Sequence, residues 1–255
     1  TDGTEVAIDM TPPSLTAVSI ISSNVDDTTK ANVGDTIKLT ITADEDIVIT
    51  SDDVLISGQA GVPSGGGDSW TAEYVVGENE AAEGLAWVRV EYKDVASNVG
   101  TVRSSVTDSS YVRIDLIAPT LTLVTIASDN GLDSTRANDG DTITVSITAS
   151  EDIVSPTVGI AGQDAVVTGI GKLFEASYGV VAADVLSNEG LVWILVEYRD
   201  LASNQGATVH AVTDATSVIL DLTAPTLTAV SISSDNGADT SMANAGDTIT
   251  ITMTA

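Results

Sequence analysis

The sequence predicts an all-β protein made of tandem β-sandwich modules, and three observations lead to this prediction. Thr, Ser, Val and Ile fill short alternating runs, which are typical of strands. No window carries a sustained apolar pattern at helical spacing. A unit of sequence recurs along the chain, as expected for a repeat architecture.

The repeat is defined by three similar segments that each begin at a proline. They start at Pro13, Pro119 and Pro225, so each lies 106 residues after the previous one (119 − 13 and 225 − 119). The same offset relates ANVGDTIKLTITADEDI to ANDGDTITVSITASEDI, and GLAWVRVEYKDVASN to GLVWILVEYRDLASN. The chain is therefore a tandem array.

The repeat sets the expected domain boundaries. Two complete modules are predicted at 13–118 and 119–224, with the last strand of a preceding module in 1–12 and the first two strands of a following module in 225–255. The chain begins with Thr1 and has neither an initiator Met nor a signal peptide, so we expect a segment of a longer protein. Two strands cannot form a stable sandwich alone. We expect either more of the same chain or neighbouring chains to complete the terminal parts.

The strands of the second module can be assigned from alternation and turn residues. In order, they are expected at 121–128, 141–150, 157–162, 164–169, 173–181, 191–198 and 217–222. About seven short strands in roughly 100 residues, joined by short loops, are typical of an immunoglobulin-like sandwich. A parallel α/β architecture would need crossover helices, and the sequence offers none. The predicted fold is a series of such sandwiches arranged as an extended rod.

The sixth strand is the most apolar, and its alternation separates a core face from an outer face. In the two modules the core face carries Val192, Ile194, Val196 and Tyr198, and Ala86, Val88, Val90 and Tyr92. Trp87 and Trp193 fall on the opposite face. There they either cover a neighbouring strand or contact a partner.

The charge balance limits the possible partners. There are 37 acidic residues against 9 Lys and Arg, a formal net charge of −28. So negative a surface repels nucleic acid and anionic membranes, and no apolar stretch is long enough to span a bilayer. The acids either keep the protein soluble in a salty medium or bind cations in clusters, and the two roles are compatible. The chain has no cysteine, so its modules must be stabilised without disulfides.

The residue inventory argues against an enzyme. The single histidine, His210, lies in no motif, and GxSxG and HExxH are absent. The glycines at 65–67 precede Asp68, which would repel a phosphate. Paired carboxylates could serve a glycosidase, but here they repeat with the module, without an aromatic-lined cleft. We expect no catalytic and no organic-cofactor residues.

The chain resembles the immunoglobulin-like extender modules of giant bacterial surface adhesins, including repeats-in-toxin adhesins of marine bacteria. DLTAPTLTAVSISSDNG, AGDTITITMTA and YRDLASN carry the resemblance, which extends over the whole chain. It implies an extracellular spacer at the cell surface that projects a distal binding domain, as in cell adhesion and biofilm formation. In that family many modules use Ca²⁺ at their junctions, and the binding tips are separate domains.

Carboxylates gather where the modules are expected to meet. In an immunoglobulin-like topology the loops after the second and sixth strands lie at the same end as the incoming linker. In the second module these positions hold Asp115 from the linker, Glu151, Asp152, Asp200 and Asn204. The corresponding residues elsewhere in the chain are Asp9, Glu45, Asp46, Asp94 and Asn98, with Asp221 in the third linker. Because Ca²⁺ takes six to eight oxygens from such groups, the sequence predicts calcium at each junction.

A second candidate cation site lies in the loop after the first strand. It contains Asp129, Asn130 and Asp133 in the second module, and Asp235, Asn236 and Asp239 in the third. The first module departs from this pattern with Asn24, Asp26 and Asp27. The alternative is an Asx-type turn whose side chains bond their own backbone. The nearby Gly-Asp steps at Gly34, Gly140 and Gly246 are interpreted as turns.

A cation at the junction would have a mechanical role. It would neutralise facing acids, tie the linker to the next module and remove bending freedom, and Pro13, Pro119 and Pro225 already favour extended linkers. The predicted function is a spacer, rigid with Ca²⁺, whose partners are neighbouring modules of the same chain. Two alternatives remain: a subunit or shaft of a self-assembling filament, sheath or surface layer made of many copies, and a module that binds carbohydrate. An isolated pair of modules would polymerise in the first alternative.

Overall fold

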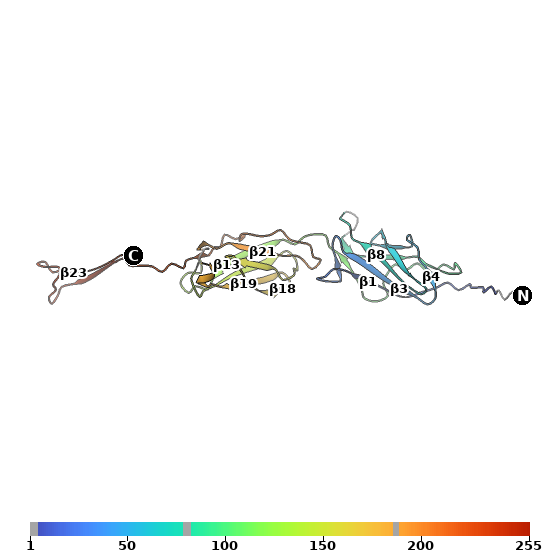
Figure 1. Cartoon of the computed structure of the whole chain (residues 1–255), viewed down its shortest axis with the longest axis horizontal. Coiled ribbons are helices and arrows are strands. Elements are labelled where there is room, and N and C mark those ends of the chain that lie inside the picture. The colour runs from blue at the N-terminus through green and yellow to red at the C-terminus, as the bar shows by residue number, and fades with distance from the viewer. Residues whose placement is uncertain (1–4, 79–82, 186–188) are drawn as a thin grey trace.

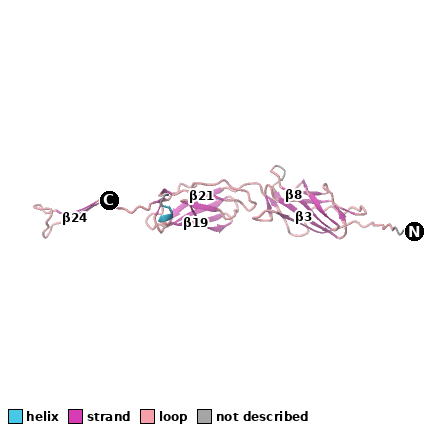
Figure 2. Cartoon of the chain, viewed as in Figure 1, coloured by secondary structure: helices cyan, strands magenta, loops and turns pink. Residues whose placement is uncertain are grey.

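The computed structural model describes residues 5–78, 83–185 and 189–255. Two β-modules lie end to end, and a separate hairpin follows the second, so the molecule is elongated (Figure 1). Strands dominate, and the single-turn helix α1 (Ala182–Val185) is the only helix in these three ranges (Figure 2). Within them, no helix has the length and apolar character needed to cross a bilayer.

The first module consists of two sheet layers. One layer has the order β1-β3-β8-β7, formed by β1 (Leu15–Ser22), β3 (Thr36–Ala43), β8 (Ser69–Val75) and β7 (Val62–Gly66). The other layer is made of short strands in the orders β10-β5-β6, β11-β4 and β2-β12-β9. Its strands are β2 (Lys30–Ala31), β4 (Ile47–Val48), β5 (Val54–Ile56), β6 (Gln59–Ala60), β9 (Gly84–Leu85), β10 (Val88–Val90), β11 (Lys93–Asp94) and β12 (Arg113–Ile114).

The second module repeats this topology. Its long sheet has the order β13-β15-β19-β18, formed by β13 (Leu121–Ser128), β15 (Thr142–Ala149), β19 (Leu173–Gly179) and β18 (Val166–Ile170). The opposite layer contains β14 (Arg136–Ala137), β22 (Ile219–Leu220), β20 (Gly190–Leu191), β17 (Gln163–Asp164), β16 (Thr157–Ile160) and β21 (Ile194–Glu197). The pairs β2–β12 and β14–β22 are parallel, whereas the long sheets are antiparallel.

This strand order is that of an immunoglobulin-like sandwich, in which the first, second, fifth and fourth strands share a sheet. The predicted fold class is confirmed. Most predicted strands lie within one or two residues of the observed ones. The sixth is an exception, because β21 begins at Ile194, three residues after the predicted start at 191.

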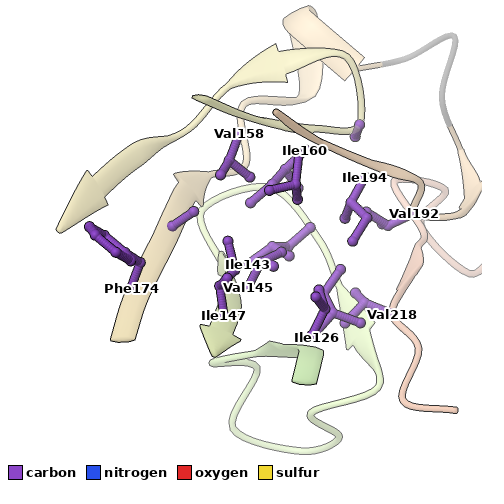
Figure 3. Packing of buried hydrophobic residues seen from close by; sticks show 14 of the residues in the cluster. Ile126, Ile143, Val145, Ile147, Val158, Ile160, Phe174, Val192, Ile194 and Val218 are labelled. Carbon is purple, nitrogen blue, oxygen red and sulfur yellow. The ribbon is translucent and has the colours of Figure 1, made fainter. Parts of the chain in front are cut away.

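Each module has its own hydrophobic core, built mainly of Val and Ile. In the second module Val158 and Ile160 on β16 point toward Ile143 and Val145 on β15 across the two layers (Figure 3). The side chains predicted for the core face of the sixth strand are buried, with Ala86 partly so. Trp87 and Trp193 lie on the outer face, about half exposed, at 50% and 48%.

The C-terminal hairpin repeats the first strand pair of a module. It contains β23 (Ala229–Ser234) and β24 (Ile249–Thr254), which pair antiparallel like β13 and β15. Its apolar residues Val230 and Ile232 are 62% and 69% exposed, whereas the equivalent Val124 and Ile126 are buried in the second core. The hairpin thus has the pattern of a module with one face uncovered. Residues 5–12 form no strand here.

Candidate metal centre

Three carboxylates from three parts of the chain meet where the second module begins. Asp115 belongs to the linker, Glu151 follows β15, and Asp200 follows β21. One oxygen of each lies within 4.8 Å of the others. The first module repeats this arrangement with Asp9, Glu45 and Asp94. We call each group of three acids a junction triad.

Strand pairing explains why these loops converge. Ile153, just after Glu151, forms an isolated bridge with Asp200. In the first module β11 pairs with β4, which places Asp94 opposite Ile47. The loop after the second long strand therefore lies beside the loop after the sixth, as the topology predicts.

A tight turn holds Asp200 in place and connects it to the linker. Asp200 is 1% exposed. Its Oδ1 accepts the backbone N–H of Asn204 at 2.9 Å, and its Oδ2 accepts the Asn204 side-chain amide at 2.8 Å. The same amide donates to the backbone carbonyl of Asp115 at 2.9 Å. Ser203 in this turn has a φ of 69°, in the left-handed region.

The first module forms the same turn with Asp94 and Asn98. The Asn98 amide donates to Asp94 Oδ2 at 2.7 Å and to the carbonyl of Asp9 at 3.3 Å, and its backbone N–H donates to Asp94 Oδ1 at 2.8 Å. Burial acts to raise the pKa of Asp94. The hydrogen bonds from Asn98 and from the backbone of Ala96 and Ser97 outweigh it, so the pKa lies below its usual value.

The glutamate of each triad has a pKa above its usual value. Burial, followed by the charges of Asp115 and Asp200, raises the pKa of Glu151, while Lys30 and Lys172 oppose the shift. Burial also raises the pKa of Glu45, together with the charges of four neighbouring aspartates, among them Asp9 and Asp94. Each glutamate therefore holds its negative charge less readily than in water.

The donor set fits a hard divalent cation. All three groups offer carboxylate oxygen, which suits Ca²⁺ or Mg²⁺ rather than a metal that prefers sulfur or imidazole. Three carboxylates supply at least three of the six to eight oxygens that Ca²⁺ takes, and backbone carbonyls or water would supply the rest. Burial is the main cause of the raised pKa of Glu151, and a cation would offset the second cause, the repulsion from Asp115 and Asp200.

Other acids proposed for the junctions lie outside the triads. Asp46 and Asp152 are exposed and lie near the turns at Gly67 and Gly171. Asp152 Oδ1 is 3.3 Å from where a Cβ on Gly171 would stand. Asp221 accepts the backbone N–H of Thr223 at 3.2 Å, and its carboxylate lies 3.9 Å from Arg136.

The residues of the second candidate site bond their own turns. Asn130 Oδ1 accepts the N–H groups of Leu132 and Asp133, and Asp133 Oδ1 accepts the N–H and hydroxyl of Thr135. Asp129 Oδ1 accepts the N–H of Thr142. Asp235, Asn236 and Asp239 repeat this pattern. These contacts are those of the Asx-type turn, the alternative to a cation site.

Two glutamates that the sequence reasoning missed hold the outgoing linkers. Glu189 Oε1 accepts the N–H of Leu222 at 2.7 Å and the hydroxyl of Thr223 at 3.2 Å. Glu83 Oε1 accepts the N–H of Leu116 at 3.3 Å. Both immediately precede a Gly-Leu pair and lie one repeat apart, so the self-comparison contained the signal.

No protein-family model matches the chain, and a comparison with curated proteins gives no significant match. Among solved structures, the chain is similar to fibronectin(III)-like modules of CbhA from Clostridium thermocellum, at 14% identity and a TM-score of 0.34, over 80% of this chain and 93% of that one. A tandem from titin aligns at 12% identity and a TM-score of 0.35, over 81% and 66%. Titin Ig tandem domains align at 11% and 0.24, over 83% and 97%. The class follows from the strand orders and cores described above: an all-β chain of tandem immunoglobulin-like modules.

Proposed function

We propose that this chain is a structural spacer of a cell-surface adhesin, in which Ca²⁺ at the module junctions stiffens a rod that projects a distal binding domain. The observation that carries the proposal is the junction triad, which occurs at the start of both complete modules. The spacer is extracellular, has neighbouring modules as its partners and has no catalytic role.

The triad suits this role because its members belong to different parts of the rod. Asp115 moves with the linker, while Glu151 and Asp200 are fixed to the second module. A cation that binds all three oxygens therefore holds the linker against the module. Without the cation, three negative charges repel one another within 4.8 Å, which favours separation of the linker from the loops.

Small-angle X-ray scattering of the chain tests the mechanical proposal. We expect a larger maximum dimension and a narrower range of shapes in millimolar Ca²⁺ than in excess chelator. Glu151→Gln should reduce the effect of Ca²⁺ at the second junction, whereas Glu175→Gln, an exposed change on β19, should not. Equal maximum dimensions in Ca²⁺ and in chelator would contradict calcium stiffening.

The alternative to the spacer is a subunit of a self-assembling filament or sheath. Sedimentation velocity at rising protein concentration separates the two functions, because the spacer stays monomeric and the filament subunit forms growing oligomers.

A further inference from the structure

A second contact joins the two modules and uses none of the triad carboxylates. It lies between residues 22–27 of the first module, which we call the tip turn, and residues 199–204 of the second, which we call the receiving turn. The side-chain amide of Asn24 donates to the carbonyl of Ala202 at 2.8 Å and to Ser203 Oγ at 3.3 Å. Asn24 is only 2% exposed, so the contact excludes water from this side chain.

An ion pair lies beside the asparagine. Arg199 donates through Nε to Asp26 Oδ2 at 2.7 Å and through Nη2 to Oδ1 at 2.9 Å. Ser203 Oγ also donates to Asp26 Oδ2 at 2.7 Å. The Asp26 side chain is 11% exposed in this contact. A two-pronged arginine–carboxylate pair fixes direction as well as distance, so it orients one module on the other.

The tip turn is ordered by bonds within its own module. Asn24 Oδ1 accepts the N–H groups of Asp26 and Asp27, and the Asn24 amide also donates to Asp35. The equivalent Asn130 and Asn236 form the same bonds, to Asp141 and Asp247. Because the turn needs no rearrangement to dock, its donor is preorganised.

The position that Asp26 occupies in the tip turn holds a different residue in each module. One repeat after Asp26 stands Leu132, which is 99% exposed, and one repeat after that stands Ala238. In the receiving turn, Arg199 corresponds to Lys93 in the first module. The asparagine therefore recurs in all three tips, while the residue that meets Arg199 does not.

We propose that the tip turn and the receiving turn form a metal-independent docking contact that selects neighbouring modules. Asn24 is the donor common to all tips, and the Asp26–Arg199 pair selects this neighbour. At the same position the tip turn of the second module has Leu132, which cannot form an ion pair with an arginine. This tip turn is therefore a poor partner for a receiving turn that contains an arginine. The contact is additional to the proposed calcium stiffening, and it does not require a bound cation.

Distance measurements between spin labels in excess EDTA test the proposal. The chain has no cysteine, so Ser64→Cys on β7 and Thr168→Cys on β18, both exposed, give one label in each module. Without metal we expect a distance distribution dominated by one docked peak, with the undocked molecules that Ca²⁺ would suppress as a minor population. Asp26→Leu and Arg199→Gln should each broaden it, lowering the ratio of docked to undocked molecules by about tenfold, as for the loss of a charged hydrogen bond.

Two further variants complete the test. The charge exchange Asp26→Lys with Arg199→Glu should narrow the distribution relative to either change alone, since only a direct pair gives such coupling. Leu132→Asp, at the other tip, should leave it unchanged. A broad wild-type distribution in EDTA, or single variants as narrow as the wild type, would overturn the proposal. All these measurements are made without metal. The outcome for the docking contact therefore does not depend on whether the junction triads bind Ca²⁺.

Discussion

Asn204 donates its side-chain amide to the backbone carbonyl of Asp115 at 2.9 Å, so one side chain in a module loop holds the linker that enters the module. The same amide bonds Asp200 Oδ2 at 2.8 Å. Asn98 makes the equivalent contacts in the first module, with a longer bond of 3.3 Å to Asp9. The linker is thus tied by hydrogen bonds at the place where the acids converge.

Asn204→Ala should destabilise the second module by roughly 1–3 kcal/mol, because the buried Asp200 carboxylate loses a donor. It should also weaken Ca²⁺ binding, since the linker is no longer held beside Glu151. Urea denaturation followed by the fluorescence of Trp193, with Trp70 and Trp87 of the first module replaced by Phe, measures the stability. Asn98→Ala is the matched variant, which should leave the unfolding of the second module unchanged.

The glutamate of the triad gives a pH dependence of defined sign. The pKa of Glu151 is raised in the folded state by burial and by Asp115 and Asp200, so the folded chain binds this proton more tightly than the unfolded chain. In chelator, the unfavourable contribution of Glu151 is present at neutral pH and is lost as the pH falls through the raised pKa toward the unfolded value of about 4.3. Stability should therefore rise on mild acidification.

Thermal unfolding at a series of pH values between about 7 and 5 measures this effect. Glu151→Gln should flatten the dependence in chelator. In Ca²⁺ the slope should reverse, because protons then compete with the cation for the carboxylates. The same pH dependence in Glu151→Gln and the wild type would show that other groups cause it.

The docking contact should respond to acid in the opposite direction. The hydrogen bond from Arg199 lowers the pKa of Asp26, and burial opposes it to a smaller extent. A depressed carboxyl pKa stabilises the contact at all pH values above the unfolded value of about 3.9, and the contribution is lost as pH falls through the folded pKa. The spin-label distances should thus remain narrow at pH 5 and broaden only in stronger acid. Broadening between pH 7 and 5 would contradict this assignment.

Gly206 should tolerate no side chain. A Cβ there would stand 2.2 Å from Cε2 of the Tyr198 ring, which is 5% exposed in the second core. Gly206→Ala should therefore displace the ring and destabilise the module by at least about 1–3 kcal/mol. Gly131→Ala is the matched control, because a Cβ at Gly131 meets nothing within 4 Å. Denaturation midpoints of the two variants measure the difference.

The repeat made much of the fold predictable. Alternation in β13 and β15 gave their positions closely, because one face of each strand is buried and the other is solvated. The helix α1 was missed because a single turn carries too little periodicity to detect.

The sites were less predictable, for reasons of geometry. The sequence grouped Asp152 with Glu151, but adjacent residues in a loop point in different directions, and Asp152 faces Gly171. The contact between Asp26 and Arg199 could not be found by comparing repeats, since it lies where the repeats differ and joins residues 173 positions apart.

Calorimetric titration of the chain with Ca²⁺ measures whether the junction triads bind the cation. With two junction triads in the part of the chain described, we expect about two equivalents of Ca²⁺ per chain and a dissociation constant on the order of 10⁻⁴–10⁻³ M, as in extracellular modules. Glu45→Gln and Glu151→Gln should each remove one equivalent. An absence of saturable binding up to several times that concentration, or a stoichiometry unchanged in both variants, would contradict a calcium-stiffened rod.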